Sequence, residues 1–436
     1  MPPMQDPLLQ RSLAAVWHPC TQMKQHDSGE LPLLTIAGGK GGWLHGTDGR
    51  SYLDGISSWW VNLFGHRNPR INAALKDQLE CIEHVILAGC THEPVVALSE
   101  RLAALTGGAL GHCFYASDGA SATEIALKMS AHYWRNSGRP EKNRFLCLAG
   151  GYHGETVGAL GVTDIALFRH AYAPLLRAAT VLPSPDARHG VNATRNAAAA
   201  LEAHLAAHHG ETAALIVEPL VQCATGMAMH DPEYLRLTRA LCDRYEVHLI
   251  CDEIAVGFGR TGTFFAHEQA GIRPDFLCLS KGITGGYLPL SVVMTRDAIY
   301  QAFYDDDTAR GFLHSHSYTG NPLACRAALA TLDTFEQDHV IAANIGKANR
   351  IDELLAPLAS HPKVNHYRRR GMIFAFDVDA DAGFGRRYYR EALTRGVLLR
   401  PIGNTVYLMP PYILDDGEIE LLCRVTGEAL EGALPA

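Results

Sequence analysis

Two short stretches decide the fold class of this sequence: His-Leu-Ile-Cys-Asp-Glu-Ile at residues 248–254 and Phe-Leu-Cys-Leu-Ser-Lys-Gly at residues 276–282. Each is a continuous apolar run that ends in polar residues, as is typical of strands buried on both faces of a parallel sheet. Lys281 follows Asp252 by 29 residues, about the length of one helix and one strand. Because ligands bind at the carboxyl ends of parallel strands, we expect both side chains at one edge of a sheet.

The same alternation of apolar runs and helical periodicity extends from about residue 66 to residue 330. It predicts an α/β fold with a mostly parallel sheet that is covered by helices on both faces. The expected strands are His112–Ser117, Phe145–Leu148, Ala214–Glu218, His248–Asp252 and Phe276–Ser280. The expected helices include Ser121–Arg135, Arg195–His208 and Tyr234–Tyr245.

Both ends of the chain differ from this central pattern. Glycine turns between short apolar runs in the first sixty residues predict small strands. After residue 330 the expected elements are a helix over 331–357, strands over 372–378, 396–400 and 405–409, a helix near 385–395 and a closing helix from Asp416. We therefore expect a large domain of residues 66–330, with residues 1–65 and 331–436 as the two parts of a smaller α+β domain.

Composition excludes several classes of protein. The 436 residues are 47% hydrophobic and 19% charged, which indicates a globular chain. The net charge of −8 argues against a nucleic-acid partner, and the basic run Arg368-Arg369-Arg370 is interpreted as solvated surface. No apolar run reaches the roughly 18 residues of a membrane span, and residues 1–6 lack a signal-peptide pattern. The 11 cysteines are scattered without a Cys-x-x-Cys pair, so we expect a reduced, cytoplasmic protein.

The segment Ser117-Asp118-Gly119-Ala120-Ser121-Ala122-Thr123-Glu124 lies between an expected strand and an expected helix. Ser121 and Glu124 have the spacing of a capping box, which predicts the start of the helix there. Gly119 allows close approach to the backbone, and free amides at a helix N-terminus bind anions, most often phosphate. An ordinary tight turn is the equally weighted alternative.

The carboxylate of Asp252 ends a buried apolar run and needs a cationic or proton-donating partner there. Nearby, Gly257-Phe258-Gly259-Arg260-Thr261-Gly262 matches the dinucleotide pattern G-x-G-x-x-G, so an NAD-dependent oxidoreductase is one alternative function. The match is weak, because no helix is expected after it and the acidic residue precedes the glycines. No metal is expected, since His314-Ser315-His316 stands alone without further ligand spacing.

Lys281 directly follows an apolar strand and precedes Gly282, which favours a desolvated amine suited to Schiff-base chemistry. Gly151-Tyr152-His153-Gly154 follows another strand and offers an aromatic face. A phosphate cradle, a buried aspartate, a reactive amine and a stacking ring together are the set that pyridoxal 5′-phosphate requires. Considered without the other motifs, Tyr152 could equally be a tyrosine of the hydrophobic core.

These segments, with Glu218-Pro219 and the stretch from His316 to Ala324, resemble the class III, fold-type I aminotransferases over nearly the whole chain. The resemblance implies a large domain with a seven-stranded type of sheet that binds pyridoxal 5′-phosphate. Three further segments look like the members of that class in biotin synthesis: Trp17-His18-Pro19, Ser57-Ser58-Trp59-Trp60-Val61-Asn62 and the stretch from Arg400 to Tyr412. Those members move the amino group of S-adenosylmethionine to 8-amino-7-oxononanoate, giving 7,8-diaminononanoate in two ping-pong stages. Another ω-aminotransferase, acting on a diamine or ω-amino acid, is the near alternative.

The resemblance also implies residue roles. Lys281 would bind the cofactor and shuttle a proton, Asp252 would hold the pyridinium nitrogen protonated, and Tyr152 would stack on the ring. In a homodimer with shared sites, the remaining cofactor contacts would come from Gly119, Ala120, His316 and Ser317, the last from the neighbouring subunit. The substrate site would be lined by Trp59, Tyr152, Lys281, Ser315 and Arg400, with Arg400 taking a carboxylate.

The sequence departs from the family pattern at three places. Ala120 stands where a serine is frequent, so a hydroxyl contact to phosphate is lost while the backbone amides remain. Ser315-His316-Ser317 replaces Gly-Pro-Thr, and Ser317 can still donate a hydroxyl. Cys20 replaces a tyrosine that contacts both substrates, including the adenine of the donor. A cysteine cannot stack on adenine in the same way. The sequence therefore indicates the substrate that accepts the amino group more directly than the substrate that donates it.

Overall fold

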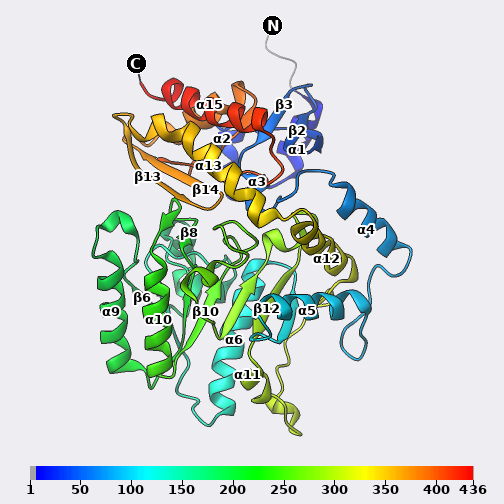
Figure 1. The fold of residues 1–436 in the computed structure, drawn as a ribbon, viewed down its shortest axis with the longest axis vertical. Helices are drawn as coiled ribbons and strands as arrows, with labels where there is room; N and C mark the ends of the chain where they lie inside the picture. The colour runs from blue at the N-terminus through cyan, green and yellow to red at the C-terminus, as the bar shows by residue number, and fades with distance from the viewer. Residues whose placement is uncertain (1–5, 436) are drawn as a thin grey trace. The chain divides into compact units, whose positions relative to one another are not determined.

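The structure, a computed structural model, describes residues 6–435. Residues 1–5, on which the expectation of no signal peptide largely rests, lie outside the described range. The chain divides into two compact units, coloured along the sequence in Figure 1. The larger unit comprises Arg70–Ile345 and Arg370–Met372. The smaller unit comprises Met1–Pro69, Gly346–Arg369 and Ile373–Ala436, and so includes segments from both ends of the chain.

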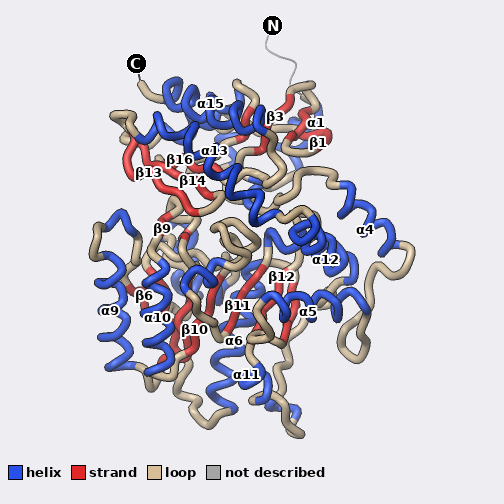
Figure 2. The backbone as a smooth tube through the Cα atoms, viewed as in Figure 1, coloured by secondary structure: helices blue, strands red, loops and turns tan. Residues whose placement is uncertain are grey.

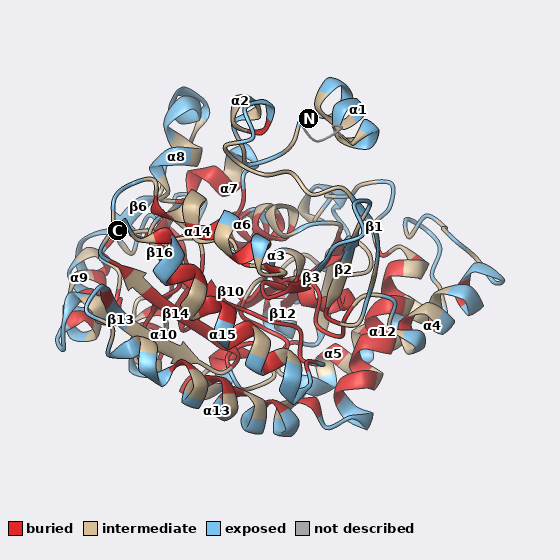
Figure 3. Ribbon diagram, turned by 90° about the horizontal axis from the view of Figure 1, so that it is seen from above, coloured by how far each residue is buried: buried red, intermediate tan, exposed pale blue. Residues whose placement is uncertain are grey.

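Buried apolar runs build a seven-stranded sheet in the larger unit, as the sequence predicts. Its strand order is β4-β12-β11-β10-β7-β5-β6, and β12 runs antiparallel to both of its neighbours while the other strands are parallel. Figure 3 shows β10 and β12 as buried. The strands are β4 His112–Ala116, β5 Arg144–Leu148, β6 Thr180–Leu182, β7 Thr212–Val217, β10 His248–Asp252, β11 Phe276–Leu279 and β12 Ser291–Thr295, and a separate hairpin is formed by β8 Val221–Gln222 and β9 Ala228–Met229.

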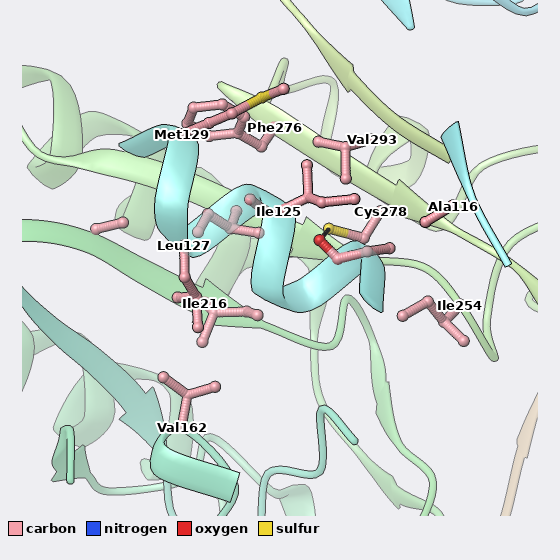
Figure 4. Close-up of a cluster of buried hydrophobic side chains, with 14 of the residues drawn as sticks. Ala116, Ile125, Leu127, Met129, Val162, Ile216, Ile254, Phe276, Cys278 and Val293 are labelled. Atoms are coloured by element: carbon pink, nitrogen blue, oxygen red, sulfur yellow. Dashed lines mark hydrogen bonds between the residues drawn. The ribbon is translucent and has the colours of Figure 1, made fainter. Parts of the chain in front are cut away.

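Helix α6, Gly119–Asn136, packs its apolar face on this sheet. Figure 4 shows Ile125, Leu127 and Met129 of α6 in a cluster with residues of the sheet such as Ile216 and Phe276. The other helices of this part of the chain are α4 Pro69–Leu79, α5 Glu93–Leu105, α7 Val157–Gly161, α8 Ala166–Arg169, α9 Ala193–His208, α10 Pro232–Arg244, α11 Asp297–Gln301 and α12 Pro322–Gln337. Short 3-10 helices are η1 His170–Leu175, η2 Ala187–His189, η3 Ala266–Ala270, η4 Lys281–Thr284 and η5 Thr308–Arg310.

The smaller unit contains two sheets, shown with its helices in Figure 2. One has the order β1-β2-β3-β15, in which β15 pairs in parallel with β3, so strands from both ends of the chain share a sheet. The other has the order β13-β14-β16. The strands are β1 Ile36–Lys40, β2 Trp43–Gly46, β3 Ser51–Asp54, β13 Val364–Arg370, β14 Ile373–Val378, β15 Val397–Leu398 and β16 Thr405–Leu408. The helices are α1 Pro7–Ala15, α2 Met23–Asp27, α3 Ser57–Trp60, most of α13 Val340–Ala359, α14 Phe384–Thr394 and α15 Asp416–Ala433.

Two expectations from the sequence are wrong. The helix expected over residues 331–357 is two helices, α12 and α13, because His339 between them has a φ of 47° that a right-handed helix cannot include. The run Arg368-Arg369-Arg370 is not solvated surface: it ends strand β13, where Arg368 pairs with Asp377 at 2.9 Å and Arg369 with Asp352 at 3.2 Å. Charged residues on a strand look like solvated surface in the sequence when their ion-pair partners lie far away along the chain.

None of the helices within residues 6–435 combines the length and apolar character that a membrane crossing requires.

Candidate active site

Asp252 is the last residue of β10 and is buried. Its Oδ2 accepts a hydrogen bond from Nδ1 of His153 at 2.7 Å, and its Oδ1 accepts one from the amide of Ile254 at 3.0 Å. These donors satisfy a carboxylate that would otherwise be unfavourable inside the protein. The sequence predicts that Asp252 needs such a partner but does not identify His153, which lies far away along the chain.

Lys281 follows β11, the strand next to β10, and the predicted placement of Lys281 and Asp252 at neighbouring strand ends is confirmed. Its φ of 46° marks a sharp turn of the backbone immediately after the strand. Burial lowers the pKa of Lys281, although the nearby Cys223, Asp252 and Glu218 act in the opposite direction. The lowered pKa increases the neutral fraction of the amine, which is the form that attacks a carbonyl or takes up a proton.

The loop after β5 carries Tyr152 and His153. The Tyr152 hydroxyl donates to Oε1 of Glu155 at 2.9 Å, and its ring meets Phe168 edge-on at 5.6 Å. The His153 amide donates to Oγ1 of Thr163 at 3.0 Å. The loop is therefore held at several points, which fixes the phenol ring before any ligand binds.

Glu218 is a buried residue at the end of β7 that the sequence analysis did not assign to the site. Its carboxylate accepts the amide hydrogens of Tyr152 and Cys223, both at 3.0 Å. Burial raises the pKa of Glu218 to about 7, with His153 acting to lower it and Asp252 to raise it. A carboxylate at the end of the predicted strand Ala214–Glu218 is the sequence signal that could have identified it.

The turn before α6 differs in detail from the expectation. The helix begins at Gly119 with Asp118 as its N-cap, because the Asp118 carboxylate accepts both the amide hydrogen of Ser121 at 2.9 Å and its hydroxyl hydrogen at 2.8 Å. The predicted capping box of Ser121 and Glu124 is therefore wrong: Asp118 reaches the third helical amide from one residue before the helix. Glu124 instead accepts hydrogen bonds from Thr156 Oγ1 at 2.6 Å and the amide of Gly158 at 2.8 Å.

This turn fits the phosphate of pyridoxal 5′-phosphate. Gly119 and Ala120 are the first two residues of α6, and helix geometry leaves their amides without intrahelical acceptors. A Cβ at Gly119 would lie 3.0 Å from the side chain of Ile254. A Cβ at Gly154 would lie 2.5 Å from Cβ of Ala120, and Gly154 has a φ of 122°. Glycine is thus required at position 154, and a side chain at position 119 would have to displace the side chain of Ile254.

Ser315, His316 and Ser317 line a cavity of about 600 Å³ in the larger unit, together with residues 86–88 and 113–115. The hydrogen bonds of this segment are local, from the His316 amide to Thr319 Oγ1 at 3.2 Å and from the Tyr318 amide to His316 Nδ1 at 3.1 Å. The structure thus groups these three predicted residues with β4.

The predicted substrate residues Trp59 and Arg400 belong to the smaller unit and lie together there. The guanidinium carbon of Arg400 is 5.5 Å from the centre of the Trp59 ring, and Arg400 Nη2 lies 3.5 Å from the carbonyl oxygen of Cys20. Trp59 is 45% exposed, whereas the adjacent Trp60 is 5% exposed and donates to the hydroxyl of Tyr407 at 3.2 Å. The two tryptophans therefore differ: Trp60 belongs to the core and Trp59 is available to a ligand.

The segment Gly257–Gly262 does not have the geometry of a dinucleotide site. Residues 254–261 form turns, and the next helical element is the short η3 at Ala266–Ala270. A dinucleotide fingerprint requires a helix that opens directly at the glycines so that its N-terminus meets the pyrophosphate. The glycine motif therefore does not support the alternative function as an NAD-dependent oxidoreductase.

Comparisons with known proteins agree with this geometry. The model of the family described as Aminotransferase class-III matches residues 24–430. The adenosylmethionine-8-amino-7-oxononanoate aminotransferase of Helicobacter pylori is 45% identical over 425 residues, covering 95% of this chain and 96% of that protein. A crystal structure of the enzyme with the same name from Methanocaldococcus jannaschii superposes with a TM-score of 0.92 at 35% identity, covering 97% of this chain and 98% of that chain. An amine transaminase from an uncultivated Pseudomonas species, solved in a PLP-bound form, superposes with a TM-score of 0.91 at 32% identity, covering 96% of this chain and 98% of that chain.

Proposed function

Because this chain belongs to the class III aminotransferase family, we propose that it transfers the amino group of S-adenosylmethionine to 8-amino-7-oxononanoate, a step of biotin synthesis. The observation that carries the proposal is the pair of groups at the ends of β10 and β11, where Asp252 is buried and Lys281 is partly buried. Asp252, paired with His153 at 2.7 Å, and the desolvated amine of Lys281 are the two groups that pyridoxal 5′-phosphate chemistry requires. The identity of the two substrates rests on full-length relatives named for this reaction, which are 45% and 35% identical to this chain.

The chain offers a contact for each part of the cofactor. Lys281 would hold the aldehyde carbon, Asp252 the ring nitrogen and Tyr152 one face of the ring. The amides of Gly119 and Ala120 would bind the phosphate. When bound, the cofactor supplies a ring that withdraws electrons from the bonds at the carbon that carries the amino group.

Each polar residue then has a defined task with a proton. Asp252, hydrogen-bonded by His153, would hold a proton on the ring nitrogen of the cofactor through its carboxylate. Nζ of Lys281 would take a proton from the substrate carbon and return one, because desolvation lowers its pKa and so favours the neutral amine that accepts a proton. Glu218 holds the main chain of Tyr152 in place through its amide.

The second subunit enters the proposal through residues 315–317. We propose a homodimer in which Ser317 donates its hydroxyl to the cofactor phosphate of the neighbouring subunit, with His316 beside it. The supporting observation is that the segment lines an open cavity of about 600 Å³, where its side chains are available to another molecule. Sedimentation of the purified protein would show a species of twice the chain mass if this is correct.

Substrate recognition is proposed for Trp59, Tyr152, Ser315 and Arg400. The planar guanidinium of Arg400 matches the carboxylate of 8-amino-7-oxononanoate, and the exposed face of Trp59 suits its aliphatic chain. The main-chain carbonyl oxygen of Cys20 faces Arg400. This contact does not depend on which side chain stands at position 20.

The donor is tested by single turnover of the cofactor-loaded protein. Loss of the visible absorbance of the lysine-bound cofactor is followed after addition of S-adenosylmethionine, L-lysine or L-alanine. We expect a response to S-adenosylmethionine. A response confined to lysine or alanine would overturn the donor, and a response to simple amines with no transfer to 8-amino-7-oxononanoate would favour the amine transaminase activity that the Pseudomonas relative is named for.

We also propose that the protein acts in the cytoplasm. Its cysteines are free thiols and seven of them are buried, as suits a reducing compartment. Fractionation of cells that produce the protein, with a cytoplasmic and a membrane marker, would test this.

A further inference from the structure

The turn that carries Trp59 has an unusual backbone. Ser57, Ser58, Trp59 and Trp60 have φ values of 52°, 46°, 68° and 74°, so four successive residues lie in the left-handed region. None of them is glycine. A side chain at Cβ disfavours this region, and non-glycine residues visit it singly rather than in a run. The turn is therefore strained, and surrounding contacts must keep it in this conformation.

Asp54 provides the central contacts. Its carboxylate is fully buried at the end of β3, where Oδ2 accepts the hydroxyl hydrogen of Ser58 at 2.7 Å and Oδ1 accepts the amide hydrogen of Ile56 at 3.3 Å. Nε2 of His66 lies 3.5 Å from Oδ2. A single buried carboxylate thus binds the residue before the turn and a residue within it, and lies close to His66 beyond it.

The two ends of the turn are anchored to the C-terminal part of the same unit. Ser57 Oγ donates to the carbonyl of Met409 at 2.7 Å, and Trp60 Nε1 donates to the Tyr407 hydroxyl at 3.2 Å. Trp59, between them, has its ring 5.5 Å from the guanidinium of Arg400. The strained turn therefore directs Trp59 toward Arg400 and Trp60 into the core.

We propose that Asp54 is a positioning residue for substrate recognition. By holding the left-handed turn, it keeps Trp59 against Arg400 before the substrate arrives, so the guanidinium is oriented for a carboxylate. The proposal rests on the proposed function in one respect, that Arg400 receives the carboxylate of the substrate. Preorganisation of this kind improves binding without changing the proton transfers at Lys281.

The first test compares Asp54→Asn with Asp48→Asn, which removes an exposed carboxylate from the turn between β2 and β3. The position of Trp59 is read in the substrate-free protein by acrylamide quenching, as the difference between each variant and the same variant carrying Trp59→Phe. We expect Asp54→Asn to increase quenching of Trp59 at least twofold and to raise KM for 8-amino-7-oxononanoate about fivefold, with kcat changed less than threefold. Asp48→Asn should change neither. Unchanged quenching and KM in a folded Asp54→Asn protein would overturn the proposal.

A milder pair of variants isolates the strain. Ser58→Ala and Ser58→Gly both remove the hydroxyl that binds Asp54, but only glycine removes the strain at a φ of 46°. We expect Ser58→Ala to raise KM three- to fivefold and Ser58→Gly by less than twofold. In an ordinary right-handed helix alanine would be the better residue, so the reverse order or equal effects would overturn the proposal even if Asp54→Asn does not fold.

The quenching measurement separates this proposal from the proposed function. If the wild-type protein does not act on 8-amino-7-oxononanoate, the function is wrong, but Trp59 still reports whether Asp54 and Ser58 hold the turn. If the wild-type protein is active and quenching is unaffected by the variants, the positioning role is wrong while the function stands.

Discussion

The ends of β10 and β11 and the turn Ser57–Trp60 both hold side chains in a fixed geometry, but they do so by opposite means. At the strand ends the geometry comes from buried charge, with the carboxylate of Asp252 2.7 Å from His153 and the amine of Lys281 desolvated nearby. At the turn it comes from strained backbone, at roughly 1–2 kcal/mol for each left-handed residue, held by hydrogen bonds. The first arrangement controls protonation and the second controls the direction of an exposed ring. The comparison teaches that, under the proposed function, the reaction type would depend on titratable groups at the strand ends, whereas substrate choice would depend on backbone conformation at the turn.

Lys281→Ala should have the largest effect, because it removes the group that we propose moves the proton. We expect turnover to fall by about 10³- to 10⁴-fold. The free energy of unfolding should not decrease, since a buried amine with a lowered pKa is itself unfavourable in the folded protein. Transaminase assays and urea unfolding would measure the two quantities.

The exposed Lys76 on α4 supplies the control for this change. Lys76→Ala should leave turnover within a factor of two. Substantial activity in Lys281→Ala would break the comparison, because the buried region would then not control the chemistry.

Asp252→Asn should have the next largest effect. The amide keeps the shape of the carboxylate and can still accept from His153, but it carries no charge to retain a proton on the cofactor nitrogen. We expect turnover to fall by about 10²- to 10³-fold with cofactor still bound. Asp338→Asn, at an exposed carboxylate paired with Arg70, is the matched control. Equal activity of the two variants would mean that Asp252 is only structural.

Much of the buried region could be predicted from the sequence. Continuous apolar runs at the strands, followed by Asp252 and Lys281, indicate a parallel sheet and its ligand-binding edge because burial and strand direction leave a local pattern. The partners of these residues could not be predicted in the same way. His153 and Glu218 reach the site through contacts between residues distant in the chain.

The turn illustrates a different limit. The sequence Ser57-Ser58-Trp59-Trp60 contains no glycine and gives no signal of left-handed backbone, since local preference opposes what the fold imposes. Local sequence preference also gives a wrong prediction at the start of α6. The spacing of Ser121 and Glu124 predicts a capping box with Ser121 as the N-cap, whereas Asp118 is the N-cap in the structure. Conformations set by tertiary contacts are those that a single sequence reveals least.

Glu218→Gln tests the electrostatics of the buried region through stability. The folded pKa of about 7 lies above the ordinary value of 4.5, so the contribution of Glu218 to stability is fully present below that ordinary value and is lost as pH rises through 7. Glutamine resembles the protonated acid and lacks this loss. The variant should therefore gain stability relative to wild type between pH 5.5 and pH 8, by about 2 kcal/mol. Urea unfolding at both pH values measures the gain.

The control for this pH dependence is Glu80→Gln, at an exposed carboxylate of the same unit. Its stability relative to wild type should be nearly the same at both pH values. If Glu218→Gln behaved in the same way, the carboxylate would be ionised at low pH and burial would not dominate its titration.

Trp59→Leu should have the smallest effect of the series and is compared with Trp60→Leu next to it. Trp59 is 45% exposed, and its contact with Arg400 is a cation–π pair at 5.5 Å. Such pairs at exposed sites contribute about 0.5–1 kcal/mol, which corresponds to a rise in KM for 8-amino-7-oxononanoate of about two- to fivefold. Unfolding should be unchanged in Trp59→Leu.

Trp60→Leu should behave in the opposite way in the same assays. It removes a buried ring and its hydrogen bond to Tyr407, so the free energy of unfolding should fall by roughly 2–4 kcal/mol. A stability loss at Trp59 as large as that at Trp60 would show that both rings serve the core. The turn Ser57–Trp60 would then stabilise the fold without a role in substrate binding. The proposed contrast between this turn and the ends of β10 and β11 would be wrong.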